Sequence, residues 1–301
     1  MISRRFILAT VAAFSLAACA SKPKEETPAA SGFTSDRVTI TTTGSGPDVI
    51  LVPGLTSSAR IWQGTVAAFP NYRFHVVQVH GFAGTPAGGN ADGPVSTPVA
   101  EEIARYITTQ NMQKPAIIGH SMGGTIAMMV AARHPDAVSR TMVVDMMPFM
   151  GAMFGPPGAT PDSVRPIADQ IRGAMNMPIP DAQRRAMADQ TIAGMIATES
   201  ERPAAVNDSM TSDRKTVGNA FHELVTTDLR PELAKIKGPF TVLYVQPTGA
   251  PLTEAQLDTY YQASYASIPG AVVKRIPNAR HFIMFDQKAV FEDEVRAFMA
   301  R

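Results

Sequence analysis

The sequence predicts an α/β fold in which helices cover both faces of a mainly parallel central sheet and a helical cap is inserted between two strands. Short runs rich in Val and Ile alternate with longer helical patterns, as in successive βαβ units. Between Met146 and about Lys237 the strand signals disappear and helical segments replace them. A chain of 301 residues that is 45% hydrophobic and 18% charged can bury one large core.

The expected elements follow from the apolar runs in chain order. Seven strands are expected at 37–43, 49–52, 74–79, 116–119, 141–145, 240–246 and 271–276. Helices are expected at 94–110, 122–134, 253–267 and 287–300. These elements predict a core made of residues 37–147 and 236–301.

Residues 148–235 are expected to form the helical cap, which starts with a stretch rich in Pro and Gly at 148–166. Nine of the 17 methionines lie between Met146 and Lys237. Methionines at helical spacing usually fill a core, but they also line adaptable apolar pockets. The cap is therefore expected to contribute apolar surface above the sheet.

The first 18 residues have the architecture of a secretory signal peptide. Arg4 and Arg5 precede an apolar run at 6–14, and this run is shorter than the roughly 20 residues that a membrane-spanning helix needs. Small residues follow it, up to Cys19. Export through the general secretory route or the twin-arginine route is compatible with this pattern.

Cys19 is the only cysteine of the chain, and the segment Leu16-Ala17-Ala18-Cys19 resembles the lipobox of bacterial lipoproteins. This resemblance implies that the signal is cut before Cys19, that Cys19 is acylated, and that residues 19–36 tether the domain to a membrane. An ordinary signal peptide with a chance cysteine is the alternative. The expected location is the periplasmic side of the cell envelope.

The charge balance disfavours a nucleic-acid partner. The chain has 27 Lys and Arg against 26 Asp and Glu, and removal of Arg4 and Arg5 with the signal leaves 25 against 26. A single cysteine excludes an intrachain disulfide and a multi-cysteine zinc site. The sequence has no metal-ligand constellation or phosphate-binding loop, so no metal and no cofactor are expected.

The segment Gly119-His120-Ser121-Met122-Gly123 carries the strongest chemical signal. It is a Gly-x-Ser-x-Gly motif between a predicted strand and a predicted helix, where a strained turn exposes the serine hydroxyl. The chain from Val38 onward thus resembles the alpha/beta-hydrolase superfamily of serine hydrolases. The resemblance implies that Ser121 is the nucleophile.

The resemblance also implies an oxyanion hole made of two backbone amides. Met122 follows the nucleophile and should donate one of them. Leu55, in the turn after the strand at 49–52, should donate the other. An ordinary Pro-Gly turn is the alternative interpretation of Pro53-Gly54.

A serine nucleophile needs a base, and His281 occupies the position expected for it. His281 follows the last predicted strand and precedes the final helix, as the catalytic histidine of the family does. The other five histidines lie in a strand, at the motif, at a helix end, in the cap or in a turn. His80, in that turn, is interpreted as structural.

The third member of a triad is less obvious from the sequence. Family members usually place the acid after the strand at 240–246, where this chain has no carboxylate. Asp145 ends the strand at 141–145 and is the preferred candidate, because parallel strand ends share one crevice. Glu254 and a serine-histidine dyad without an acid are the alternatives. Asp286 is expected to help start the last helix.

The leading hypothesis is a carboxylic ester hydrolase that forms a covalent acyl-enzyme on Ser121 and takes a small-molecule ester or acyl substrate. Peptidase, thioesterase and haloperoxidase activities occur on the same scaffold and stay open. A non-catalytic ligand-binding lipoprotein is the alternative from another class. Retention of a strained serine turn argues against it.

Overall fold

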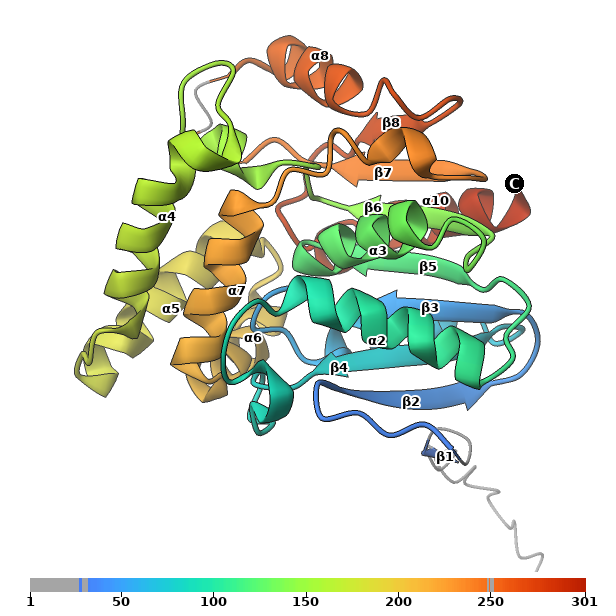
Figure 1. The fold of residues 1–301 in the computed structure, drawn as a ribbon, viewed down its shortest axis with the longest axis horizontal. Helices are drawn as coiled ribbons and strands as arrows, with labels where there is room; N and C mark the ends of the chain where they lie inside the picture. Colours follow the sequence, from blue (N-terminus) through green and yellow to red (C-terminus); the bar gives the residue numbers. More distant parts are fainter. Residues whose placement is uncertain (1–26, 29–31, 248, 250–251) are drawn as a thin grey trace, which may run out of the picture.

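The computed structural model describes residues 27–28, 32–247, 249 and 252–301, and Figure 1 shows the resulting fold. Cys19 and the predicted signal peptide at 1–18 lie outside the described residues. The strands are β1 (Thr27–Pro28), β2 (Val38–Gly44), β3 (Asp48–Val52), β4 (Arg73–Val79), β5 (Ala116–His120), β6 (Arg140–Val144), β7 (Phe240–Tyr244) and β8 (Val272–Arg275).

These strands form one sheet with the order β1-β2-β4-β3-β5-β6-β7-β8. Strand β2 is antiparallel to β1 and β4, whereas the strands from β4 to β8 pair in parallel. Parallel neighbours place their carboxyl ends at one edge of the sheet. The loops that follow β3, β5, β6 and β7 therefore meet at that edge, beside the cap helices in Figure 1.

The helices of the core cover both faces of the sheet. They are α1 (Gln63–Ala68), α2 (Ser96–Thr109), α3 (Met122–Arg133), α8 (Glu254–Ser264), α9 (Ile283–Asp286) and α10 (Lys288–Ala300), with short 3-10 turns at η1 (Ala59–Trp62) and η2 (Gly88–Asn90). One hydrophobic cluster joins the sheet to α2, α3 and α8, and a second joins it to η1, α9 and α10.

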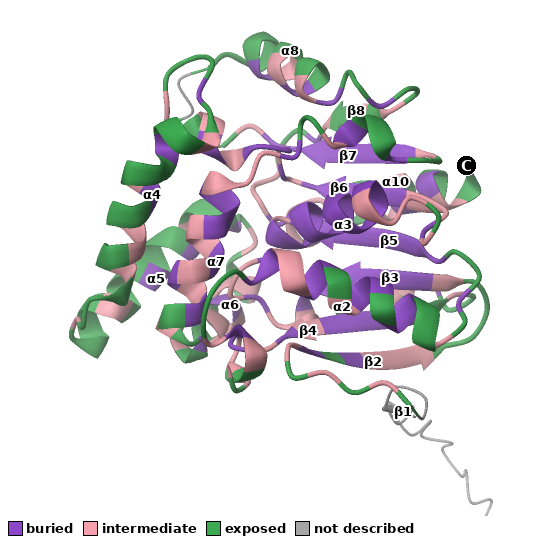
Figure 2. Cartoon of the chain, in the orientation of Figure 1, coloured by how far each residue is buried: buried purple, intermediate pink, exposed green. Residues whose placement is uncertain are grey.

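The central strands are apolar over most of their length because each buries both sets of alternate side chains. In β3, Ile50 and Val52 belong to one cluster, whereas Val49 and Leu51 belong to the other. A sheet covered on both faces requires this pattern. Figure 2 shows the consequence as buried residues throughout the inner strands.

Four helices lie between β6 and β7 and form the cap. They are α4 (Pro161–Asn176), α5 (Asp181–Met195), α6 (Arg202–Thr211) and α7 (Arg214–Thr226), with 3-10 turns η3 (Met150–Met153), η4 (Glu199–Glu201) and η5 (Leu233–Lys235). Helix α4 packs on α7, and α5 packs on α6. Ile192 and Val206 of α5 and α6 belong to the same cluster as Phe291 of α10, so this half of the cap shares a core with the sheet.

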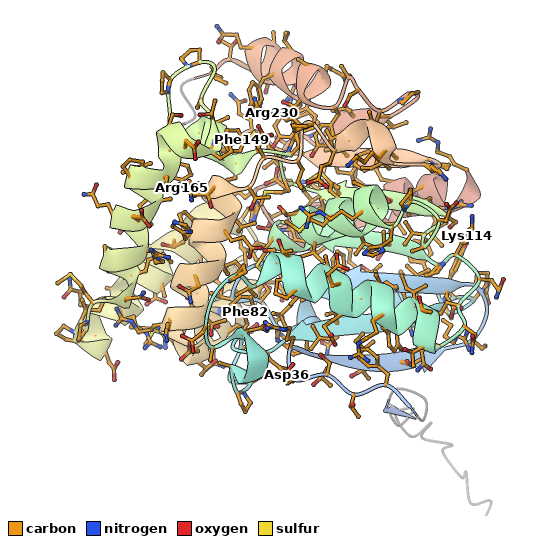
Figure 3. All side chains as sticks on the ribbon, in the orientation of Figure 1. Asp36, Phe82, Lys114, Phe149, Arg165 and Arg230 are labelled. Atoms are coloured by element: carbon orange, nitrogen blue, oxygen red, sulfur yellow. The ribbon has the colours of Figure 1, made fainter. Side chains whose placement is uncertain are left out.

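The two chain segments that enter and leave the cap are joined to each other. The Leu229 amide donates a hydrogen bond to the Pro148 carbonyl at 2.9 Å. The Arg230 guanidinium lies over the Phe149 ring, 4.7 Å from its centre, and both are labelled in Figure 3. Phe149 is only 1% exposed, so this contact fixes the base of the cap.

The predicted fold class is confirmed, and the ends of the seven predicted strands agree with β2–β8 to within two residues. The helix predicted at 253–267 ends earlier, at Ser264. Inside the predicted tether, Thr27 and Pro28 pair with Thr42 and Thr41 of β2. No helix among the described residues is both long and apolar enough to cross a bilayer.

Candidate active site

Ser121 occupies a strained turn between β5 and α3. Its backbone has φ 55° and ψ −123°, which lies in the region that residues with a side chain seldom adopt. The Ser121 amide donates to the carbonyl of Val144 in the neighbouring strand β6 at 2.8 Å. The turn thus places Ser121 directly beside the end of β6.

The glycines of the motif are required by close backbone packing. A Cβ atom on Gly119 would lie 2.0 Å from the Gly123 carbonyl oxygen, and one on Gly123 would lie 2.2 Å from the Val52 carbonyl oxygen. Neither backbone can accept a side chain without moving. The Gly-x-Ser-x-Gly spacing therefore follows from how tightly β5, α3 and β3 approach one another.

Asp145 and His281 form a close pair at the same edge of the sheet. Asp145 Oδ2 lies 2.6 Å from His281 Nδ1, and Asp145 Oδ1 accepts a hydrogen bond from the Val245 amide at 3.0 Å. The carboxylate is 10% exposed and the imidazole 23% exposed. Asp145 can therefore hold the imidazole with Nδ1 protonated, which leaves Nε2 free to accept a proton.

The backbone around Asp145 is itself fixed by its neighbours. Asp145 has φ 52°, and its amide donates to the Leu243 carbonyl at 2.7 Å. The Tyr265 hydroxyl donates to the Met146 carbonyl at 2.6 Å. Burial, and then the nearby Asp145 charge, raise the pKa of Tyr265 well above its usual value, so this hydroxyl keeps its proton.

His120 links the turn that carries Ser121 to the loop that carries His281, and nothing in the sequence indicated this contact. It is fully buried, its Nε2 lies 2.9 Å from the His281 carbonyl oxygen, and the two imidazole rings lie 4.6 Å apart. Burial and the nearby His281 lower the pKa of His120 well below its usual value. A neutral His120 can donate from Nε2 to that carbonyl and so hold the residue that carries the predicted base.

Ser121 lies close to this arrangement but is not yet joined to it. The ring of His281 bonds to Asp145, and its carbonyl oxygen bonds to His120. Among the described residues, no hydrogen bond joins the His281 ring to the Ser121 hydroxyl. Catalytic hydrogen bonds are often long or poorly aligned in a free enzyme and tighten when substrate binds. Ser121 directly follows His120 in the chain, and its amide is bonded to the carbonyl of Val144, the residue before Asp145. The serine is therefore next to both residues that contact His281.

The predicted oxyanion loop runs alongside the serine. A Cβ atom on Gly54 would lie 2.9 Å from Ser121 Cβ, so the segment that carries Leu55 passes next to the nucleophile position. Thr56 has φ 59°, which turns the chain sharply after Leu55. Met122 starts α3 immediately after Ser121. Met122 thus follows the serine directly, and the residue before Leu55 passes beside the serine side chain.

The remaining sequence candidates have other contacts. Glu254 Oε2 pairs with Arg275 at 2.8 Å, and its side chain is 62% exposed. His80 bonds to the Thr39 hydroxyl and the Asp36 carbonyl, which agrees with a structural role. The expectation for Asp286 was wrong, because Gln287 precedes α10 and Asp286 instead accepts hydrogen bonds from the cap and from Arg280.

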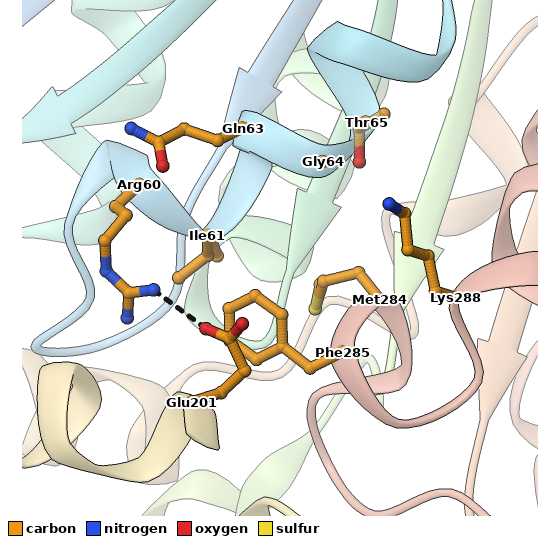
Figure 4. A pocket seen from close by; sticks show the side chains of 9 residues that line it. All are labelled: Arg60, Ile61, Gln63, Gly64, Thr65, Glu201, Met284, Phe285 and Lys288. Carbon is orange, nitrogen blue, oxygen red and sulfur yellow. Dashed lines mark hydrogen bonds and ion pairs between the residues drawn. The ribbon is translucent and has the colours of Figure 1, made fainter. Parts of the chain in front are cut away.

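A pocket of about 190 Å³ lies beside the loop that carries His281, between η1, η4 and the start of α10 (Figure 4). Nine residues line it: Arg60, Ile61, Gln63, Gly64, Thr65, Glu201, Met284, Phe285 and Lys288. Arg60 donates to Glu201 at 3.0 Å, so these two lining charges are paired. None of the predicted catalytic side chains lines this pocket.

Comparison with known proteins agrees with this geometry. Residues 49–294 match the family model described as "Alpha/beta hydrolase family", and the chain belongs to that family. It is 24% identical over 261 residues to a pimeloyl-[acyl-carrier protein] methyl ester esterase from Pectobacterium carotovorum, with 85% of this chain and 96% of the relative covered. The corresponding Vibrio cholerae esterase is 27% identical over 261 residues, with 85% and 92% covered.

Solved structures show the same fold. An esterase from Exiguobacterium antarcticum superposes with a TM-score of 0.72 at 18% identity, covering 88% of this chain and 96% of that one. At this identity, the structural likeness shows the fold alone.

Proposed function

We propose that the protein is a serine hydrolase that cleaves carboxylic esters. The observation that carries this proposal is the 2.6 Å contact between Asp145 and His281 beside a serine held at φ 55°. A strained non-glycine turn costs folding free energy and persists where the surrounding structure enforces it. The pimeloyl-[acyl-carrier protein] methyl ester esterases among its relatives support an ester as the substrate class.

In the proposed reaction, Ser121 Oγ attacks the ester carbonyl carbon while His281 Nε2 accepts the serine proton. The Leu55 and Met122 amides stabilise the negative charge that develops on the carbonyl oxygen. Collapse of this intermediate breaks the ester bond, and His281 returns its proton to the leaving alcohol. Water, activated by the same imidazole, then releases the acid and restores Ser121.

A panel of nitrophenyl esters with acyl chains of increasing length tests this proposal. The mature domain should hydrolyse at least one member, and Ser121→Ala should reduce turnover by several orders of magnitude at unchanged melting temperature. Turnover that survives in Ser121→Ala would refute the mechanism. A folded domain that hydrolyses no ester, thioester or amide would favour the ligand-binding alternative.

We further propose that Cys19 is acylated and holds the domain at the periplasmic side of a membrane. The support is the sequence alone, namely the lipobox-like Leu16-Ala17-Ala18-Cys19 after a short apolar run. Cys19→Ala should move the protein from the membrane fraction to the soluble fraction while esterase activity persists. Unchanged membrane association in that variant would exclude the lipid anchor.

A further inference from the structure

The Asp286 carboxylate joins the cap to the loop that carries His281. Its Oδ1 accepts hydrogen bonds from the amides of Ala197 and Thr198 at 2.9 and 2.8 Å, and from the Thr198 hydroxyl at 2.9 Å. Its Oδ2 accepts from the Arg280 amide at 2.9 Å. One side chain thus satisfies three backbone amides that belong to two segments about 80 residues apart along the chain.

Further hydrogen bonds join the same two segments, which we call the histidine loop (278–286) and the α5 end (193–198). The Phe282 amide donates to the Met195 carbonyl at 3.2 Å. The Arg280 guanidinium donates to the carbonyl oxygens of Ala193 and Ile196. The contacts around Asp286 are therefore the centre of a continuous interface between the cap and the histidine loop.

His281 lies in the middle of this interface. The Arg280 amide before it is held by Asp286, and the Phe282 amide after it is held by Met195. On the other side, His120 contacts the carbonyl oxygen of His281. The backbone on both sides of the predicted base is therefore fixed by the α5 end, and the direction of the ring toward Asp145 depends on that backbone.

We propose that Asp286 is a positioning residue that fixes the histidine loop to the α5 end and thereby holds the His281 ring against Asp145. Its effect on the reaction rate rests on the proposed function, whereas its effect on the loop does not. The α5 end then acts as part of the catalytic framework, and the cap contributes to the chemistry through it.

Asp286→Asn is the most informative variant. An amide has one acceptor oxygen. With that oxygen in the place of Oδ1, the NH₂ group faces the Arg280 amide, so the hydrogen bond to the residue before His281 must be lost. Misplacement of a catalytic group costs up to about 100-fold in rate, and we expect kcat to fall about 10- to 100-fold with little change in KM. Thr198→Val, which removes the hydroxyl that contacts Asp286 and the Phe285 carbonyl but keeps the Thr198 amide, should have a smaller effect in the same direction.

Asp293→Asn is the matched control. Asp293 lies on α10, its side chain is 75% exposed, and it pairs with Arg296. None of the catalytic residues named above is its hydrogen-bond or ion-pair partner. This variant changes the net charge of the chain by the same amount as Asp286→Asn. It should leave every readout below unchanged.

Three measurements on the mature domain decide the proposal: hydrogen exchange of the two segments, the downfield NMR signal of the His281 Nδ1 proton, and the rate of Ser121 labelling by a fluorophosphonate. In Asp286→Asn, exchange should accelerate in 193–198 and 278–286, the downfield signal should weaken, and labelling should slow. The control should match the unmodified protein.

Unchanged exchange in these segments would overturn the proposal. So would faster exchange with an unchanged His281 signal, because the ring would then be held without the carboxylate. If Asp286→Asn does not fold, Thr198→Val carries the same test with the same readouts. If the unmodified domain is not labelled at all, the proposed function fails, while exchange and the His281 signal still decide the role of Asp286.

Discussion

Replacement of Asp145 by Asn would remove the partner of the His281 ring without removing its volume. In the structure, Asp145 Oδ1 accepts from the Val245 amide at 3.0 Å and Oδ2 lies 2.6 Å from His281 Nδ1. An asparagine that keeps its oxygen on the Val245 amide must turn its NH₂ group toward Nδ1. The imidazole then carries its proton on Nε2 and cannot accept the proton of Ser121.

The size of the effect follows from this change of tautomer. The equivalent change in a serine protease triad lowers kcat about 10⁴-fold. The Asp145 carboxylate is 10% exposed here, so the contact is weakly screened, and we expect a loss of about 10³- to 10⁴-fold, or about 4 to 5.5 kcal/mol of barrier. The assay is kcat/KM for the best nitrophenyl ester, with urea unfolding to verify that the variant is folded.

Glu254→Gln provides the comparison. Glu254 pairs with Arg275 and is 62% exposed, so its loss should leave kcat/KM nearly unchanged. A tenfold or smaller loss in Asp145→Asn would refute the assignment of the acid. It would point to a serine-histidine dyad, and a larger loss in Glu254→Gln would reassign the role to that residue.

Three further perturbations test other parts of the structure. Burial and the adjacent His281 hold the pKa of His120 well below 6.5, so the unfolded chain binds more protons than the folded chain below that pH. The free energy of unfolding should therefore fall as pH drops from 6.5, by up to about 1.4 kcal/mol per pH unit. His120→Gln should flatten this slope, measured by urea unfolding at pH 5 and 7.5. Gly123→Ala places a Cβ 2.2 Å from a carbonyl oxygen and should prevent accumulation of folded protein, whereas Gly173→Ala, with open space around it, should not. Glu223→Gln should lower the free energy of unfolding by about 1 to 3 kcal/mol, because its buried carboxylate accepts the first amides of α2 at 2.6 to 2.8 Å; an unchanged urea midpoint would contradict this.

The strands and the core helices were predictable because burial of a parallel sheet on both faces leaves a local signature. Every residue of β5 and β7 is buried, and both strands are mostly apolar, with His120 and Thr241 as their polar members. The Gly-x-Ser-x-Gly motif was recognisable from five consecutive residues, although Gly123 is required by its contact with Val52 of the adjacent strand β3. The strand and motif signals could be found without knowing how distant segments pack.

The parts that escaped prediction depend on contacts between distant segments. His120 contacts a residue 161 positions later, and Asp286 contacts residues nearly 90 positions earlier. Asp286 stands just before the last helix, so a local rule assigned it to a helix start that the structure does not use. The preference for Asp145 over Glu254 rested on its place at the end of the strand after the nucleophile, where some members of the family resembled carry the acid. The structure supplies the 2.6 Å contact with His281 that the sequence could not contain.

The central claim is that Ser121 is an activated nucleophile, and intact mass after exposure to a fluorophosphonate tests it without knowledge of the substrate. We expect a single covalent adduct on the folded mature domain, its absence in Ser121→Ala, and its slow formation in Asp145→Asn. No adduct on the folded domain, or an adduct that persists in Ser121→Ala, would contradict the claim.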